Sequence, residues 1–199
     1  MNRVLNRRRL GAHARRLIAT CLTAAAAANI SACAKAENAT PADVAMQFYV
    51  TLELSGVRDL PEPRAAMAIE PYLTPELATQ LRTAYDQRIA KRRAAGATSP
   101  LADRGSFPPG EGNPFSSLFE GHSSYGAKAT IMRGDTALVP IGFANADQKP
   151  AVQWSDTLVL IKQVTPQNSW RITDIRYGTN WEFGYQGSLT QVLRTMLAP

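Results

Sequence analysis

Cysteine and histidine are scarce in this sequence of 199 residues, which has two of each. Both cysteines, Cys21 and Cys33, lie near the N-terminus, and His122 is the only histidine after residue 33. A zinc or iron site of the common kind is built from several Cys or His ligands around one ion. The scarcity therefore excludes a Cys-rich or His-rich metal site in the body of the chain, and we expect no metal and no cofactor.

A long hydrophobic run is absent as well. The apolar stretch Leu17 to Ala28 has about a dozen residues, whereas a helix that spans a bilayer needs about 20. Arginines precede this stretch and small residues follow it, and that order is typical of a cleaved signal peptide. We therefore assign residues 1–32 to a signal peptide. The arginines are Arg3, Arg7, Arg8, Arg9, Arg15 and Arg16.

The tetrapeptide Ile30-Ser31-Ala32-Cys33 resembles the lipobox of bacterial lipoproteins, in which signal peptidase cuts before the cysteine. The resemblance implies that Cys33 becomes the first mature residue, carries the acyl chains and begins a tether over residues 33–39. Residue 34 is Ala rather than Asp, which in proteobacterial lipoproteins implies the periplasmic side of the outer membrane. Cleavage after Ala36 by ordinary signal peptidase is the alternative, and it would give a soluble periplasmic or secreted protein.

Neither charge is in excess in the mature chain. The full sequence has 22 basic and 16 acidic residues, a net charge of +6, but six arginines leave with the signal peptide and no acid does. The balance is then zero, so the electrostatic attraction that a nucleic-acid partner would need is missing. The expected partners are the membrane, through the lipid anchor, and an envelope protein or a small ligand.

Residues 40–199 are long enough to form one domain with a buried core. Thr40-Pro41-Ala42-Asp43 and Thr74-Pro75-Glu76 each combine an N-cap, a proline at the first helical position and an acid in the first turn, so each predicts a helix start. The many prolines and glycines after residue 96 predict a long loop, which is expected to be functional or mobile. The predicted helices are 41–54, 64–69 and 75–95, and the predicted loop is 97–122.

From Ser124 onward the apolar period changes from about 3.6 to 2, which predicts strands. Ser188 is expected to cap a short C-terminal helix. Helices followed by strands predict an α+β fold, in which N-terminal helices pack on a curved, cone-like antiparallel sheet of about four strands. The predicted strands are 125–131, 137–143, 152–164 and 170–177, with a tight turn at Arg133-Gly134-Asp135.

Four short strings resemble an uncharacterised family of proteobacterial lipoproteins with a nuclear transport factor 2-like, cone-shaped α+β domain. They are Gln47-Phe48-Tyr49, Asn113-Pro114-Phe115-Ser116-Ser117, Trp154-Ser155-Asp156 and Trp170-Arg171-Ile172-Thr173-Asp174-Ile175-Arg176-Tyr177. The resemblance implies the same fold. It carries no established activity, so no catalytic residue is transferred from it.

Asp156 is the first candidate site residue. In an unbroken strand it shares a face with Trp154 and Leu158, which places a carboxylate on the apolar, concave side of the sheet. Burial there would raise the pKa of the carboxyl group, as a general base in a pocket requires. The simpler interpretation is that Asp156 accepts backbone N–H bonds or pairs with an arginine and so fixes the sheet. Trp154 is the second candidate.

His122, Tyr49 and Tyr177 complete the set of candidate ligand-binding residues. His122 could act as acid, base or pH sensor, although the simpler interpretation is an exposed loop histidine. The two tyrosines could line the mouth of the cone. Lys91-Arg92-Arg93, with Arg82 and Arg88, could touch anionic lipid or an envelope polymer, but a solvated helix end explains the same residues.

The leading hypothesis is a non-enzymatic, membrane-anchored binding domain in the periplasm. It would contact a small molecule or an envelope protein through the concave sheet and the 97–122 loop. One alternative is an immunity-type inhibitor of an envelope-directed toxin. The other is an isomerase or dehydratase of the cone-shaped class, with Asp156 as base and His122 or a tyrosine as acid.

Overall fold

The helices precede the strands, as the change of period predicts. A computed structural model describes residues 39–94, 96, 112–163, 169–182 and 184–198, all within one unit, Ala39–Pro199. The predicted signal peptide, Cys33, the alternative cleavage site and the tether up to residue 38 lie outside the described residues. Residues 97–111 of the predicted loop lie outside them too.

Three helical segments open the domain. Helix α2 (Pro41–Leu54) begins with a capping box, in which the Thr40 hydroxyl accepts from the Asp43 N–H and the Asp43 carboxylate accepts from the Thr40 N–H at 2.9 Å. Helix α3 (Pro63–Ile69) leads into a 3₁₀ turn, η1 (Glu70–Tyr72), and helix α4 (Pro75–Ala94) follows. The predicted helix starts at Pro41 and Pro75 are confirmed. They could be predicted because capping depends on residues within one turn of each other.

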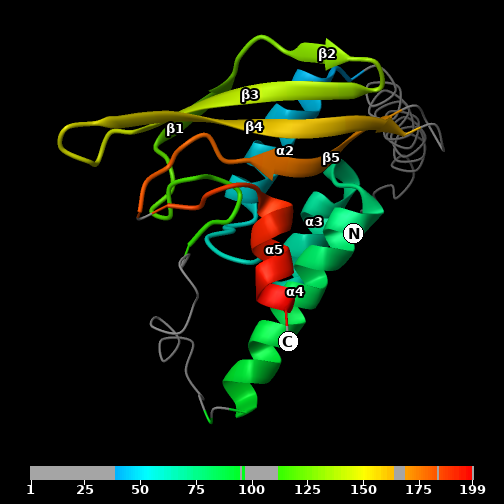
Figure 1. Cartoon of the computed structure of the whole chain (residues 1–199), viewed down its shortest axis with the longest axis vertical. Helices are drawn as coiled ribbons and strands as arrows, with labels where there is room; N and C mark the ends of the chain where they lie inside the picture. The colour runs from blue at the N-terminus through cyan, green and yellow to red at the C-terminus, as the bar shows by residue number, and fades with distance from the viewer. Residues whose placement is uncertain (1–38, 95, 97–111, 164–168, 183, 199) are drawn as a thin grey trace, which may run out of the picture. The chain divides into compact units, whose positions relative to one another are not determined.

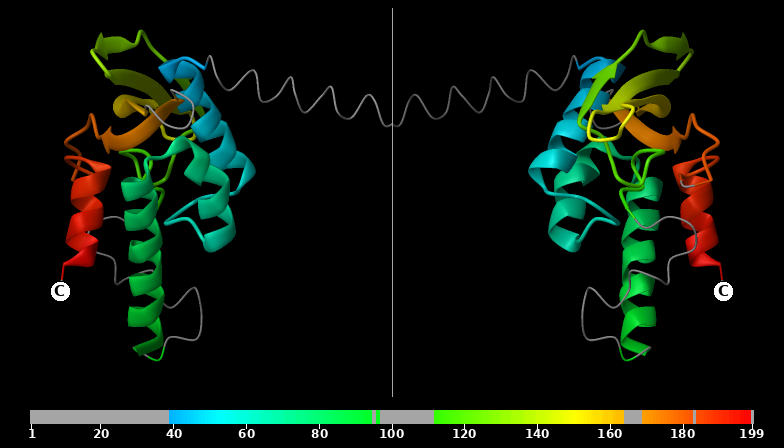
Figure 2. Two further views of the ribbon diagram at one scale, coloured as in Figure 1. Left: turned by 90° about the vertical axis from the view of Figure 1, so that its right-hand side faces the viewer. Right: turned by 90° about the vertical axis from the view of Figure 1, so that its left-hand side faces the viewer.

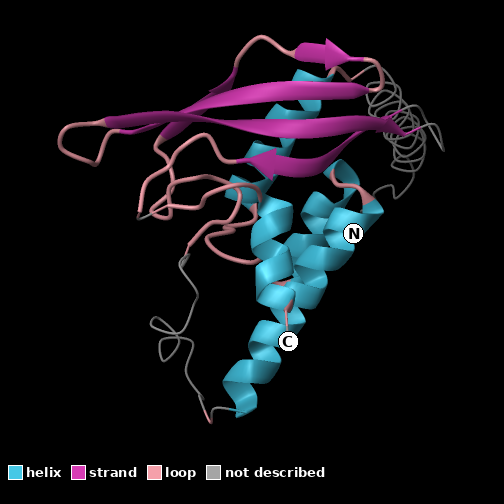
Figure 3. Ribbon diagram, in the orientation of Figure 1, coloured by secondary structure: helices cyan, strands magenta, loops and turns pink. Residues whose placement is uncertain are grey.

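The strands form one antiparallel sheet in the order β1-β3-β4-β5 (Figures 1 and 3). Strand β2 also pairs with β3, along the part of its length that β1 does not cover. Helices α2, α4 and α5 pack against it, and Figure 2 shows the helices on one side of the sheet. The α+β prediction is confirmed. The strands are β1 (Ser124–Ala127), β2 (Ile131–Arg133), β3 (Thr136–Asn145), β4 (Val152–Gln163) and β5 (Ser169–Arg176).

The expected single strand over 125–131 is in fact two strands, which raises the number from about four to five. Ala127 pairs with Ile141 and Ile131 with Leu138, so the edge has three residues where β3 has two. Pro140 explains the break. Its carbonyl accepts from the Lys128 N–H at 2.8 Å, so the side of β3 on which proline lacks an N–H faces this edge.

The extra residue in this edge also reverses which side chains face the core. Simple alternation predicts that Ile131 lies on the same face as Tyr125. In the structure Tyr125 is half-buried and lies opposite Phe143. Ile131 lies opposite Leu138 and is 49 % exposed. The predicted face of Ile131 is therefore wrong, and the bulge is the cause.

Helix α5 (Leu189–Leu197) forms as predicted, but its cap comes from another element. The Ser188 side chain makes no capping hydrogen bond, so the predicted cap is wrong. Asp174 of β5 replaces it, because its carboxylate accepts from the Thr190 N–H at 3.0 Å and from the Thr190 hydroxyl at 3.1 Å. The cap therefore ties α5 to the sheet.

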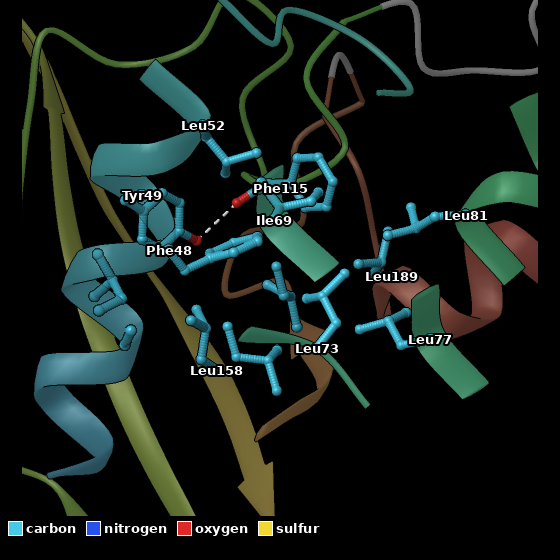
Figure 4. Packing of buried hydrophobic residues seen from close by; sticks show 14 of the residues in the cluster. Phe48, Tyr49, Leu52, Ile69, Leu73, Leu77, Leu81, Phe115, Leu158 and Leu189 are labelled. Atoms are coloured by element: carbon cyan, nitrogen blue, oxygen red, sulfur yellow. Dashed lines mark hydrogen bonds between the residues drawn. The ribbon is translucent and has the colours of Figure 1, made fainter. Parts of the chain in front are cut away.

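The core lies between the inner face of the sheet and the helices. Alternate residues of β3 and β4 point into it, as the period of 2 predicts. Figure 4 shows Phe48 of α2 and Ile69 of α3 beside Phe115, which belongs to no helix or strand, and Leu77 of α4 belongs to the same core. Phe115 is fully buried, so part of the loop is core.

Candidate functional site

The segment of residues 113–118 lies inside the domain, and we call it the inserted segment. All of its residues are buried, with Phe115, Ser116 and Ser117 each 0 % exposed. The Asn113 side chain starts it with a turn, because its Oδ1 accepts from the Phe115 N–H at 3.0 Å. Buried backbone groups need partners, and the candidate residues supply several of them.

Asp156 is one of these partners. It is fully buried on β4, as alternation predicts. Its Oδ2 accepts from the Ser117 N–H at 2.8 Å, and its Oδ1 accepts from the Gly178 N–H at 2.9 Å and from the Ser117 hydroxyl. Burial raises the pKa of this carboxyl group, and these hydrogen bonds partly offset the rise. The contacts favour the structural interpretation of Asp156.

Tyr49 and Tyr177 hold the other end of the inserted segment. The Tyr49 hydroxyl donates to the Phe115 carbonyl at 2.8 Å, a bond drawn in Figure 4, and the Tyr177 hydroxyl donates to the Pro114 carbonyl at 2.6 Å. Burial raises the pKa of both phenols well above 10. Each hydroxyl thus stays protonated and serves as a donor to the chain itself.

Trp154 lies beside Asp156 on the same face and also contacts the inserted segment. Its indole Nε1 donates to the Ser116 hydroxyl at 3.2 Å. Its ring stacks on Phe143, with the ring centroids 5.2 Å apart, and meets Trp181 edge-on at 5.9 Å. The polar and apolar parts of the indole are therefore both used within the domain.

His122 lies just beyond the inserted segment, against α2. Its side chain is only 7 % exposed, so the expectation of an exposed loop histidine is wrong. The ring is 4.9 Å from Tyr125 and 5.0 Å from Phe143, centroid to centroid, and its Nε2 is 3.6 Å from Glu53 Oε1. Burial lowers the pKa of His122, although Glu53 opposes this effect. The apolar neighbours come from β1 and β3, which the linear sequence could not place.

Glu53 also accepts from the Tyr125 hydroxyl at 3.1 Å. Burial and this carboxylate together raise the pKa of Tyr125 to about 12. The Nδ1 of His122 is buried and has no hydrogen-bond partner in the part of the chain that the structure describes. This arrangement favours the neutral imidazole.

Four of the five candidate residues therefore converge on the inserted segment, and His122 adjoins them through Tyr49, at 6.2 Å between ring centroids. Sequence reasoning missed Ser117 and Gly178 as the partners of Asp156. It also missed Tyr185, whose N–H donates to the Ser117 carbonyl at 2.9 Å. The available signal was the string Asn113-Pro114-Phe115-Ser116-Ser117, in which a turn dipeptide precedes a large apolar residue.

The described residues contain neither a candidate metal site nor a candidate membrane-spanning helix. No set of three or more His, Cys, Asp or Glu side chains there is placed to hold one ion. None of the helices in that part of the chain is both long and apolar enough to cross a bilayer.

The fold and contacts define a single α+β domain whose inner sheet face is covered by helices and by its own inserted segment. Comparison with protein-family models, with curated proteins and with solved structures finds no match. The resemblance to cone-shaped lipoproteins therefore stays a prediction.

Proposed function

We propose that this protein is a lipid-anchored lipoprotein of the periplasmic side of the outer membrane, with a non-enzymatic binding domain. The support for the anchor is the sequence around Cys33, which lies six positions before the first described residue, Ala39. Several acyl chains, at about 0.8 kcal/mol for each buried CH₂ group, are enough to hold such a domain at a membrane.

One observation carries the proposal that the domain binds rather than catalyses. The carboxylate that would serve as base accepts three hydrogen bonds from Ser117 and Gly178. The phenols of Tyr49 and Tyr177 donate to backbone carbonyls. A general base or acid must reach the substrate proton, and these groups are engaged inside the domain, which counts against the isomerase or dehydratase alternative.

The same contacts change where on the domain a ligand is expected to bind. The concave sheet face near Asp156 is covered by the inserted segment, so a ligand is expected to contact the outside of the domain. The immunity-type alternative stays a prediction. Co-purification with a toxin encoded by a neighbouring gene would support it.

Mass spectrometry of the protein purified from the membranes of a Gram-negative host tests the proposal. We expect a mature N-terminus at Cys33 with the mass of its acyl chains, and we expect Cys33→Ser to abolish membrane retention. An unlipidated N-terminus at Glu37, or an intact Met1 in the cytosol, would contradict the anchor.

A further inference from the structure

A hollow of about 800 Å³ lies at the C-terminal end of α2, bounded by the connection to α3 and by α3 and α4. Helix α3 packs against both α2 and α4, which brings these segments together (Figure 2). We call this feature the arginine hollow. Its charged lining residues are Arg58, Arg64, Arg88, Arg92, Asp59 and Glu62.

The charge of the arginine hollow differs from that of the mature chain. Among the lining residues that the structure describes, four guanidinium groups face two carboxylates, an excess of two positive charges, whereas the mature chain is balanced. Asp59 is already paired with Arg88. Arg58 and Arg64 are exposed and make no salt bridge in the described part of the chain. A concave surface of one sign concentrates oppositely charged ligands more than a flat surface does.

Three separate segments contribute these arginines, which distinguishes the hollow from an ordinary basic helix end. Arg88 and Arg92 are four residues apart on α4 and therefore lie on one face of that helix. Arg64 comes from α3 and Arg58 from the connection before it. The sequence shows only the basic run at the end of α4, for which a solvated face is a sufficient explanation.

All four cations among the described lining residues are arginines, and this points to the class of ligand. The guanidinium group is planar and offers paired N–H donors that match two oxygens of a phosphate group. We propose that the arginine hollow binds a small phosphorylated molecule with at least two negative charges. This inference rests on the proposed binding function, and it names the ligand class and the surface.

The phosphate could belong to a free molecule or to a lipid headgroup. The first described residue, Ala39, lies next to the first turn of α2. The arginine hollow lies at the other end of this helix. Helix α2 has 14 residues, which at 1.5 Å per residue gives about 21 Å. The hollow is thus well separated from the point where the tether enters, and this favours a free phosphorylated molecule.

Calorimetric titration of the purified mature protein with pyrophosphate tests the inference. We expect saturable binding that weakens as salt is raised, because the contacts are ionic. The double variant Arg58→Gln/Arg64→Gln should bind about tenfold more weakly or worse, since it loses two charge-assisted contacts. Both side chains are exposed, so the fold should be kept, and circular dichroism checks this.

The matched control is Arg133→Gln/Arg176→Gln, which removes the same charge from exposed positions on the sheet. It should leave pyrophosphate binding nearly unchanged. An equal loss in both variants would mean a general charge effect and would overturn the inference.

A second arm distinguishes the source of the phosphate. The same proteins are mixed with phosphatidylglycerol vesicles and, for comparison, with phosphatidylcholine vesicles. Binding to the anionic vesicles alone, lost in Arg58→Gln/Arg64→Gln, would assign the hollow to headgroups. Binding to neither probe would overturn the inference. This result would not affect the proposed lipid anchor, which the mass spectrum of Cys33 tests separately.

Discussion

Asp156 of β4 accepts hydrogen bonds from both the N–H and the hydroxyl of Ser117, which lies 39 positions earlier in the chain. A third bond, from the Gly178 N–H, reaches the same carboxylate. One side chain therefore connects the inserted segment, the central sheet and the residues after β5. A buried carboxylate of this kind is costly to alter, because its partners would lose their acceptors.

Asp156→Asn is expected to lower the free energy of unfolding by about 1–3 kcal/mol. The amide keeps the shape of the carboxylate, but its NH₂ group would face an N–H donor at one of the two acceptor positions. Urea unfolding followed by tryptophan fluorescence measures the change. The control Asp147→Asn, in the exposed turn before β4, should change it by less than about 0.5 kcal/mol. Equal stability of the two variants would contradict the structural role of Asp156.

Tyr49→Phe should destabilise the domain by about 1–3 kcal/mol, because the buried Phe115 carbonyl loses its donor. Tyr177→Phe should act similarly through the Pro114 carbonyl. The comparison is Tyr85→Phe on α4, a partly exposed position, where little change is expected. If Tyr49→Phe unfolds at the same urea concentration as the unmodified protein, the hydroxyl does not hold the inserted segment.

Gly178→Ala tests the close approach of the backbone beside Asp156. A Cβ atom at residue 178 would lie 1.8 Å from the Ser155 carbonyl oxygen, so the backbone would have to move. We expect a loss of about 1–3 kcal/mol or more in the free energy of unfolding. Gly126→Ala is the matched control, since a Cβ atom there meets nothing within 4 Å. Thermal melts of the two variants should therefore separate clearly, and coincident melts would argue against this packing.

His122 should make the stability depend on pH. Burial lowers its pKa below 6.5, so the folded state favours the neutral ring. The resulting stabilisation is complete above pH 6.5 and is lost as the pH falls through the lower pKa of the folded state. Urea midpoints on either side of this range measure the effect. His122→Phe, which suits the aromatic neighbours, should reduce the loss on acidification, and an unchanged pH profile would show that His122 is not its source.

The α+β class and the helix starts were predictable because they depend on neighbours in the chain. Thr40 and Asp43 are three residues apart, and alternation alone places Asp156 on the inner face. The N-cap of α5 was not predictable in this way, since its acceptor is Asp174, 16 positions from Thr190. Ser188 satisfied the local rule, but the longer-range carboxylate replaced it.

By itself the sequence determined the order of helices and strands, the face on which Asp156 lies and the equal numbers of basic and acidic residues after residue 32. Only the tertiary structure decided that Asp156 is bonded to Ser117 and Gly178, that Pro140 interrupts the edge pairing, and that Arg58 and Arg64 share a hollow with Arg92. The physical reason is range. Capping and alternation act within a few residues, whereas the partner of a buried polar group is chosen by how distant segments pack.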